Sequence, residues 1–462
     1  MWNLEKNKAN IAMIDENGNT ISYEEIQTYI DRIRVICSKR NLVLCLCKNT
    51  LGSITGYLAF IELRLIPILL EYSMEKDLMV EINANYDPYY IWAPEEINFE
   101  QYSKSISFLG YSLWKKKEEK VCVFHPDLAV LLSTSGTTGS SKMVRLSYCN
   151  LMENSHSIIN YLNITENERA ITVLPMCYAY GLSIINTHIM SGATLLVTNN
   201  SIIDKRFWKM AITYKATSLS GVPYTYQLLE RMNFCKWNLP HLKTLTQAGG
   251  KLSKKLQSLF AEYATNQGKN FIVMYGQCEA TARISFLASE FAKIKLGSIG
   301  KAIPNGELCI VNENGKKIED PGHIGELQYN GPNVMMGYAK NALDLQIGDV
   351  QGECLLTGDM GYFDEDGFYY IVGRKKRFVK MMGKRVSLDD LENYLKDRQG
   401  INCVCIEKND RLIVFLTDIN KKKKVLEILV KVFKLPEMIL DIREILEIPR
   451  TNSGKIKYSD LE

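Results

Sequence analysis

The stretch S-T-S-G-T-T-G-S-S-K, residues 133–142, decides how this chain is interpreted. It follows an apolar run over 128–132 that predicts a strand. Glycines let a backbone turn with positive φ and approach a ligand closely, while successive N–H groups form an anion-binding nest. The hydroxyls add donors and Lys142 adds a positive charge. These features indicate a polyphosphate-binding loop, and a flexible Gly/Ser loop is the alternative.

Length, charge and cysteine usage narrow the class of protein. At 462 residues the chain is long for one core, so two or more domains are expected. A formal net charge of +4 gives no reason to expect a nucleic-acid partner. Twelve cysteines lie without C-x-x-C pairs and no secretory leader is expected, which predicts a cytoplasmic protein with reduced thiols. The most apolar segment, 57–70, is too short to span a membrane and is interpreted as a buried helix.

Strand-like runs alternate with helical patterns along most of the chain, which predicts a layered α/β architecture. Strands are expected at 172–174, 194–197 and 271–274, and one-face spacing from Leu151 to Leu162 predicts a helix capped by Ser147. Glycine-punctuated short strands at 307–311, 325–329 and 368–372 indicate a β-rich subdomain. Two further strands and a helix after Arg374 indicate a small α+β domain. The segment G-R-K-K-R-F therefore marks a boundary between domains 1–375 and 376–462.

The opening stretch differs from the phosphate loop of nucleoside triphosphatases, because that motif requires G-x-x-x-x-G-K-[ST] and no glycine precedes Lys142 in that way. It resembles instead the phosphate-binding loop of the adenylate-forming superfamily, which includes acyl-CoA synthetases, peptide-synthetase adenylation domains and luciferases. The resemblance extends over about residues 120–462. Further stretches follow in the order of that family: LPMCYAYGL (174–182), YGQCEAT (275–281), GELQYNGPNVMMGY (325–338), LLTGDMGYFDEDGFYYIVGR (355–374), KMMGKRVSLDDLE (380–392) and IPRTNSGKIKY (448–458).

The resemblance implies a reaction in two steps. A small carboxylic acid attacks the α-phosphate of ATP to give an acyl-adenylate and pyrophosphate, and a thiol of CoA, or the phosphopantetheine of an acyl carrier protein, then takes the acyl group. The first step joins two anions, so the site must neutralise charge and hold the attack in line. The small C-terminal domain is expected to be mobile and to swing about Lys376 between the two steps.

The resemblance also implies a role for each motif residue. Glu279 is expected to bind Mg²⁺, Lys142 the phosphates, and Lys455 both the carboxylate and the α-phosphate. Tyr275 is expected against the adenine, Asp359 and Arg374 on the ribose, and Gly383 where a pantetheine arm passes. The remaining nucleotide contacts are expected from Thr134, Ser135, Gly136, Thr137, Thr138, Gly139, Gly276 and Cys278.

This chain departs from the family pattern at three places. Cys278 stands where a Thr is frequent, and a thiol is a weak donor, so either catalysis tolerates it or Thr281 substitutes. Lys376 stands where an Asp is frequent at the hinge. Tyr178 replaces a His, and C-Y-A-Y-G lacks the Asp that members selecting α-amino acids use to pair the ammonium, which argues against a free α-amino acid.

The acyl pocket is expected from the stretches C-Y-A-Y-G, S-G-V-P-Y-T (220–225) and Q-A-G-G-K-L (247–252), together with the residues after Glu279. Bulky side chains there favour a short or polar acid. Arg283 could meet a second polar group of the substrate, although a surface arginine is the expected state. The pocket residues singled out are Tyr178, Tyr180, Gly221, Gly249 and Gly250.

Two alternatives stay open. The adenylate could pass to an amine, or the chain could be a non-catalytic nucleotide-binding scaffold. The basic segment 374–385 could meet phosphates of CoA, an acidic carrier protein, or only solvent.

Overall fold

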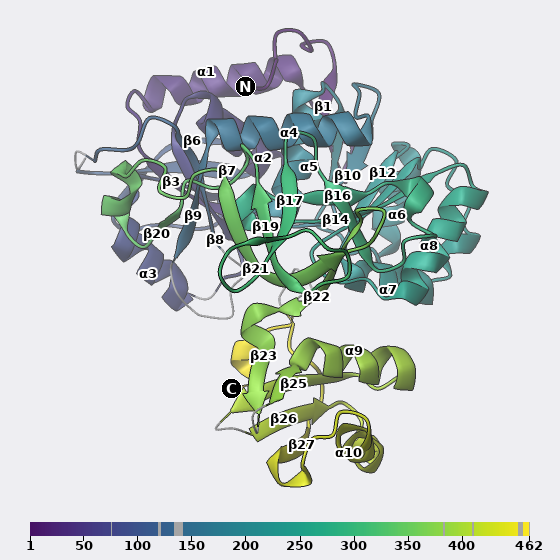
Figure 1. The fold of residues 1–462 in the computed structure, drawn as a ribbon. Helices are drawn as coiled ribbons and strands as arrows, with labels where there is room; N and C mark the ends of the chain where they lie inside the picture. The colour runs from purple at the N-terminus through teal and green to yellow at the C-terminus, as the bar shows by residue number, and fades with distance from the viewer. Residues whose placement is uncertain are drawn as a thin grey trace. The chain divides into compact units, whose positions relative to one another are not determined.

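The computed structural model describes residues 1–74, 76–118, 122–133, 142–381, 384–408, 411–450 and 456–461. The chain divides into two compact units. The first unit holds Met1–Leu296, Ala302–Glu307 and Asn330–Leu355, and the second holds Gly297–Lys301, Leu308–Tyr329 and Leu356–Glu462. Large sheets with helices between and around them confirm the expected α/β class (Figure 1).

The first unit contains an eight-stranded sheet in the order β20-β9-β8-β4-β3-β5-β7-β6. Its central strands are buried on both faces, because odd-numbered residues of β3 face one core cluster and even-numbered residues face another. The strands are β3 (Leu42–Cys47), β4 (Ile66–Glu71), β5 (Tyr90–Pro94), β6 (Tyr102–Phe108), β7 (Tyr111–Lys116), β8 (Leu128–Ser133), β9 (Met143–Ser147) and β20 (Tyr338–Ala339).

A second set of strands in this unit runs in the order β15-β14-β13-β12-β10-β11-β1-β2. Strands β11, β10, β12, β13 and β14 are parallel neighbours, as α/β crossovers require. The bounds are β1 (Ile11–Asp15), β2 (Thr20–Ser22), β10 (Arg169–Ile171), β11 (Thr194–Val197), β12 (Ser218–Gly221), β13 (Thr244–Gln247), β14 (Asn270–Tyr275) and β15 (Ser285–Leu287).

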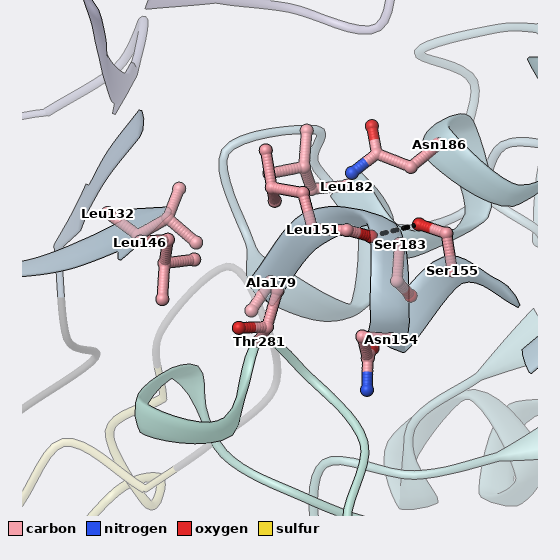
Figure 2. Close-up of a pocket in the computed structure, with 10 residues that line it drawn as sticks. All are labelled: Leu132, Leu146, Leu151, Asn154, Ser155, Ala179, Leu182, Ser183, Asn186 and Thr281. Carbon is pink, nitrogen blue, oxygen red and sulfur yellow. Dashed lines mark hydrogen bonds between the residues drawn. The ribbon is translucent and has the colours of Figure 1, made fainter. Parts of the chain in front are cut away.

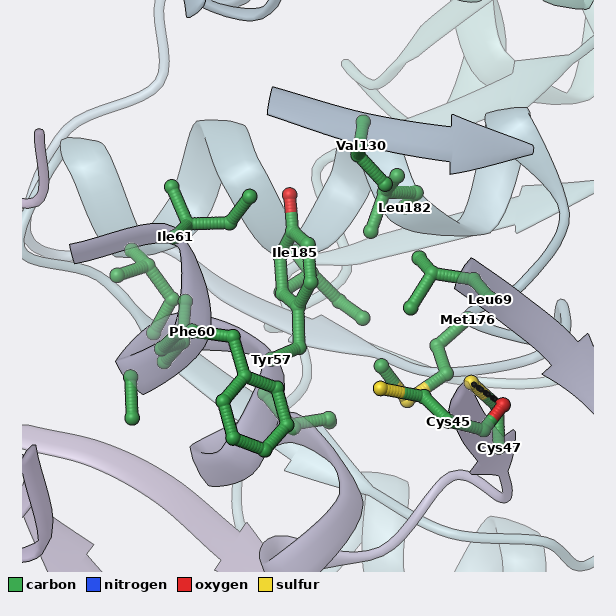
Figure 3. Close-up of a cluster of buried hydrophobic side chains, with 14 of the residues drawn as sticks. Cys45, Cys47, Tyr57, Phe60, Ile61, Leu69, Val130, Met176, Leu182 and Ile185 are labelled. Atoms are coloured by element: carbon green, nitrogen blue, oxygen red, sulfur yellow. Dashed lines mark hydrogen bonds between the residues drawn. The ribbon is translucent and has the colours of Figure 1, made fainter. Parts of the chain in front are cut away.

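Helices α2 and α5 lie between the two sheets of the first unit. Figure 3 shows their side chains meeting strand residues in one cluster, with Tyr57 of α2 beside Ile185 of α5. The Tyr57 hydroxyl donates to Asn186 Oδ1 at 2.9 Å inside this layer. The helices of the unit are α1 (Tyr23–Ile36), α2 (Leu51–Glu62), α3 (Lys76–Tyr86), α4 (Tyr148–Leu162), α5 (Ala179–Met190), α6 (Lys205–Thr213), α7 (Pro223–Arg231) and α8 (Lys254–Asn266).

The second unit combines a β-rich part with a small α+β part. The β-rich part has strand order β18-β17-β19-β21-β22-β16. In the small part, Cys403, Cys405, Leu412 and Val414 face α9 and α10, while Val404 and Ile413 face Leu461. The bounds are β16 (Ser298–Ala302), β17 (Glu307–Val311), β18 (Lys317–Ile318), β19 (Gly325–Asn330), β21 (Cys354–Phe363), β22 (Tyr369–Arg374), β23 (Phe378–Met381), β24 (Lys384–Ser387), α9 (Leu388–Gln399), β25 (Cys403–Lys408), β26 (Arg411–Leu416), α10 (Lys422–Lys431) and β27 (Leu440–Glu444).

Most expected elements are present, and two expectations are wrong. The helix capped by Ser147 is α4, whose cap side chain accepts from the Asn150 N–H. The strand expected at 172–174 is β10, which lies three residues earlier. The segment 57–70 is not one helix: α2 ends at Glu62, Arg64 takes a positive φ of 57°, and β4 begins at Ile66. Both halves are buried, so apolar character alone could not separate them.

The described part of the chain contains no helix that is long and apolar enough to cross a membrane.

Candidate active site

Three charged or polar side chains of the first unit form a chain of contacts beside the phosphate-loop motif. Lys142 directly precedes β9, and Tyr338 of β20 pairs with Val144 of that strand. The Lys142 ammonium lies 3.3 Å from the centroid of the Tyr338 ring. The Tyr338 hydroxyl donates to Glu279 Oε1 at 2.9 Å. Two of the predicted site residues, Lys142 and Glu279, are therefore connected through a tyrosine.

Tyr338 holds a cation on its ring face and a carboxylate on its hydroxyl. A cation over an aromatic face is attracted by the ring quadrupole, and a hydrogen bond to a charged acceptor is stronger than a neutral one. Burial and the charge of Glu279 raise the pKa of Tyr338 above its usual range, so it stays a neutral donor. We predicted no role for Tyr338 from the sequence. Its place as the last residue of the motif at 325–338 was the feature that could have indicated one.

The backbone around Glu279 is fixed by a loop that follows β19 in the sequence. The Met335 N–H donates to the Glu279 carbonyl at 2.9 Å, and Asn333 Nδ2 donates to the Ala280 carbonyl at 2.7 Å. Thr281 has φ of 52°, and its hydroxyl donates to the Asn333 carbonyl at 2.7 Å. The Thr281 hydroxyl therefore already donates its proton to Asn333. The structure gives no support to the expectation that Thr281 replaces the weak donor Cys278 at the α-phosphate. Cys278 itself is buried.

The residues before Glu279 leave no room for a larger side chain at the motif glycine. Tyr275 is half-buried at the end of β14. A Cβ on Gly276 would lie 1.9 Å from the Ala282 carbonyl oxygen, and backbone cannot move aside cheaply. Glycine at 276 is therefore required by the close return of the chain at Ala282 and Arg283.

The expected pocket residues gather around the start of α5 and the ends of β12 and β13. Tyr178 is half-buried and precedes α5, and its hydroxyl lies 2.9 Å from where a Cβ on Gly249 would stand. Gly249 has φ of +80°, which favours glycine. A Cβ on Gly221 would meet Thr225 at 2.7 Å, and one on Gly250 would meet Pro223 at 3.2 Å. The structure thus brings Tyr178 and Gly249 together.

A cavity of about 200 Å³ lies between helices α4 and α5 and one face of β12, β13 and β14. Arg283 lines it, which corrects the expectation of a surface arginine: its side chain is 2% exposed. The Arg283 guanidinium lies 4.1 Å from the centroid of the buried Tyr180 ring. The other residues of the wall include Ile158, Leu162, Ser183, Ile184, Thr187, His188, Ser218, Ser220, Thr244, Thr246 and Met274.

Hydroxyl side chains line the strand side of this cavity in a regular pattern. Ser218 and Ser220 alternate along β12, as Thr244 and Thr246 do along β13, and alternate residues of a strand face the same side. The Thr246 hydroxyl is 2.8 Å from both Ser220 Oγ and the Tyr180 hydroxyl. Period-two hydroxyls in S-L-S-G and T-L-T-Q were the signal that sequence reasoning missed.

A much smaller cavity lies beside Thr281. Figure 2 shows it among Leu132, Leu146 and Leu151 with Asn154, Ser155 and Asn186, and Ser155 donates to the Leu151 carbonyl at 2.6 Å. Its volume is about 10 Å³, room for about one water molecule. An acyl group does not fit there, so of these two cavities only the larger one can hold a substrate.

The second unit brings together the two residues expected at the ribose. Asp359 of β21 and Arg374 of β22 are cross-strand partners, and Arg374 Nε lies 2.7 Å from Asp359 Oδ1. The Asp359 side chain is 4% exposed and that of Arg374 is 54% exposed. The more exposed arginine therefore holds the buried Asp359 carboxylate in position.

The basic segment after β22 is partly neutralised within the second unit. Lys375 forms an ion pair with Glu326 at 2.7 Å. Arg377 contacts both Asp389 and Glu392 of α9. Burial raises the pKa of Glu392 to about 7, and the charge of Asp389 adds to the rise, although Arg377 counteracts it in part. Lys375 and Arg377 therefore form their ion pairs within the second unit.

Several predicted site residues lie outside the described residues. They are Thr134, Ser135, Gly136, Thr137, Thr138, Gly139, Gly383 and Lys455. Strands β8 and β9 on either side of 134–141 pair antiparallel, with Ser133 opposite Met143.

Glu279 fits a metal that takes few protein ligands. Within the described ranges, no three His, Cys, Asp or Glu side chains gather into a metal-binding group. Mg²⁺ usually keeps several waters and uses one or two carboxylates plus phosphate oxygens. A single carboxylate oriented through Oε1 by Tyr338 suits such an ion.

Comparisons with known proteins find CoA ligases among the relatives of this chain. Curated relatives include 4-coumarate–CoA ligase-like 6 of Arabidopsis thaliana, 30% identical over 295 residues (62% of this chain, 52% of the relative), and oxalate–CoA ligase of the same plant, 29% identical over 360 residues (72% and 67%). The chain thus spans about half to two thirds of the length of these relatives.

Among solved structures, o-succinylbenzoate CoA synthetase from Bacillus subtilis, in complex with its acyl-adenylate intermediate, superposes with a TM-score of 0.78 at 21% identity. The match covers 99% of this chain and 97% of that one, which shows a shared fold. The family description "AMP-binding enzyme" matches residues 2–339. Since that match includes the phosphate-loop motif, Glu279 and Tyr338, the chain belongs to the AMP-binding enzyme family.

Proposed function

We propose that this protein is an acid–thiol ligase that activates a small carboxylic acid with ATP and transfers the acyl group to the thiol of CoA. The single observation that carries the proposal is the contact chain Lys142–Tyr338–Glu279, which places a cation and a carboxylate in fixed positions beside the phosphate-loop motif of an AMP-binding enzyme. The matches to CoA ligases support CoA as the acceptor.

In the proposed first half-reaction a carboxylate oxygen bonds to the α-phosphorus while the bond to pyrophosphate breaks. The loop 134–139 and Lys142 bind the outer phosphates, and Lys142 neutralises part of their charge. Glu279 would hold Mg²⁺, and the bound ion would offset charge on the phosphate oxygens. Gly276, Cys278 and Tyr275 contact the nucleotide, and glycine at 276 lets this turn pack closely against the backbone at Ala282.

The second unit supplies the remaining proposed roles. Asp359, held by Arg374, accepts from the two ribose hydroxyls, and Lys455 contacts the carboxylate and the α-phosphate. We also propose 1–375 and 376–462 as the functional domains, with rotation about Lys376 presenting Lys455 for adenylation and Gly383 for thiol transfer. In that transfer the thiol sulfur bonds to the acyl carbon and AMP leaves.

The proposed acid is short or polar and has no free α-amino group. The half-buried Tyr178 against Gly249 and the buried Tyr180 fill space among the residues expected to form the acyl pocket. The cavity of about 200 Å³ lies below the roughly 300–1,000 Å³ typical of sites for drug-sized ligands. The stretch C-Y-A-Y-G offers no carboxylate for an ammonium.

Two finer points stay proposals. A carrier-protein phosphopantetheine is a second possible thiol acceptor. A cytoplasmic location is supported by twelve cysteines that are all free thiols in the structure, as in a reducing compartment.

The test is acid-dependent exchange of pyrophosphate into ATP, measured over a panel of carboxylic acids, followed by product analysis with and without CoA. We expect exchange with at least one acid and an acyl thioester only when CoA is added. Glu279→Gln should reduce exchange while ATP binding persists. If ATP binds but no acid supports exchange, the chain is a nucleotide-binding scaffold; if exchange occurs and only an added amine is acylated, CoA is not the acceptor.

A further inference from the structure

Arg283 is a buried cation whose charge is not matched by an acidic side chain. It is 2% exposed, and its Nε has no hydrogen-bond partner among the described residues. Within the described ranges no carboxylate lies at ion-pair distance from it. Its Nη1 donates a long hydrogen bond of 3.4 Å to the Ala282 carbonyl, and its guanidinium also lies within hydrogen-bonding reach of the Tyr161 side chain, so its described partners are neutral. A polar group with these properties requires an explanation.

Burying a guanidinium without an acidic partner lowers the stability of the folded protein. Arginine stays protonated in proteins, so it cannot escape the cost of burial by losing its proton. A buried charge without a counter-ion is strongly unfavourable. The ring of Tyr180 at 4.1 Å offsets part of this cost through a cation–π contact. The charge also lies close enough to Tyr161 to counteract, in part, the rise that burial causes in its pKa.

The acidic side chain on the wall of the cavity, Glu168, does not form an ion pair with Arg283. Glu168 lines the same cavity, and its carboxylate is paired with Lys243 at 3.0 Å. His188, also on the wall, is held neutral because burial lowers its pKa. The cavity thus contains one unmatched positive charge, at Arg283, together with the hydroxyls of Ser220 and Thr246.

We propose that Arg283 binds a second anionic group on the acid, so that the substrate is a short dicarboxylic acid activated at one carboxylate and held at the other. This inference rests on the proposed acid–thiol ligase function and names its substrate class. Arginine presents a planar fork of donors that matches a carboxylate in bidentate geometry. The volume of about 200 Å³ limits the spacer between the two carboxylates to a few carbons.

The position of Arg283 relative to Glu279 is fixed by the backbone. The Arg283 carbonyl accepts from Asn154 Nδ2 at 3.1 Å and from Asn333 Nδ2 at 2.9 Å. The same Asn333 amide also donates to the carbonyl of Ala280, next to Glu279. A distal carboxylate bound at Arg283 is therefore held at a set distance from the residues proposed to act at the phosphates, which selects chain length as well as charge.

The first experiment compares acids of equal chain length in the pyrophosphate exchange assay on the unmodified protein. Succinate is paired with butyrate and glutarate with pentanoate, so that each pair differs in one carboxylate. We expect the dicarboxylate of at least one pair to show a kcat/KM roughly 10–100-fold higher, the range for a hydrogen-bonded charged group. Equal or better exchange with the monocarboxylates would overturn the inference while leaving the proposed function intact.

The second experiment changes the arginine. Arg283→Met keeps the length and apolar stem but removes the charge, and Arg283→Lys keeps the charge but loses the fork. Arg231→Met, at an exposed arginine of α7, is the matched control. We expect Arg283→Met to lower dicarboxylate kcat/KM mainly through KM and to remove the preference over the monocarboxylate, with Arg283→Lys between the two.

The outcomes separate the two proposals. Absence of exchange with every acid, in the unmodified protein, contradicts the proposed function itself. Exchange that keeps the same dicarboxylate preference after Arg283→Met contradicts only the role of Arg283. If Arg283→Met does not fold, the matched-acid comparison on the unmodified protein still decides the substrate class.

Discussion

Replacing Tyr338 with Phe removes one hydroxyl and tests whether Glu279 is positioned by its neighbour. The hydroxyl donates to Glu279 Oε1 at 2.9 Å, and the ring contact to Lys142 at 3.3 Å is kept by Phe. Partners that orient a metal-binding carboxylate typically contribute about 10–100-fold in metal affinity. Because Tyr338 and Glu279 are only half-buried, we expect the lower end, about tenfold, or about 1.4 kcal/mol.

The assay is pyrophosphate exchange as a function of Mg²⁺ concentration at saturating ATP and acid. For Tyr338→Phe we expect the half-saturating Mg²⁺ concentration to rise about tenfold, with the KM for the acid little changed. Tyr338→Leu, which also removes the ring beneath Lys142, should in addition raise the KM for ATP. Tyr72→Phe is the control, because Lys48 lies 3.6 Å from that ring and the Tyr72 hydroxyl contacts no described acceptor. An unchanged Mg²⁺ dependence in Tyr338→Phe would refute the positioning role.

Three further changes test other parts of the molecule. Cys278→Thr should keep or raise the rate of pyrophosphate exchange, because a hydroxyl is the better donor if this buried position faces the α-phosphate. If pyrophosphate exchange is abolished, the thiol is needed for packing. Asp359→Asn should raise the KM for ATP about tenfold without changing the KM for the acid, because it weakens the pair with Arg374 and removes one charged acceptor. Glu392→Gln should flatten the pH dependence of hydrogen exchange at the Cys405 amide, which donates to Glu392 Oε1. Since burial raises the folded-state pKa of Glu392 from 4.5 to about 7, its contribution to stability is fully present below about pH 4.5 and is lost as pH rises towards 7. The hydrogen-exchange rate of the Cys405 amide is divided by its intrinsic rate at each pH. If the resulting pH profile is the same in the Glu392→Gln and unmodified proteins, the titration of Glu392 is contradicted.

Local features of the fold could be predicted because they depend on residues near one another. The apolar runs in N-C-V-C-I-E (402–407) and R-L-I-V-F-L-T (411–417) predicted strands, and β25 and β26 are buried on both faces. Ser147 could be identified as a helix cap because its hydroxyl acts on an N–H three residues later. The segment 57–70 was misjudged because two buried elements of equal apolarity adjoin, and the turn at Arg64 carries no glycine or proline signal.

For the site, the sequence by itself determined which motifs are present and their order, and hence the family and the residues to examine, such as Lys142, Glu279 and Asp359. Only the tertiary structure decided which side chains meet. Tyr338 reaches Glu279 across 59 residues of sequence because β20 pairs with β9. Arg283 is buried because α4, α5 and three strands close around it, and no local pattern encodes that enclosure. Burial and the pairing of charges depend on what packs against a residue from distant segments, so the sequence could name Arg283 as a candidate, but only the folded chain shows that this cation is buried without an acidic partner among the described residues.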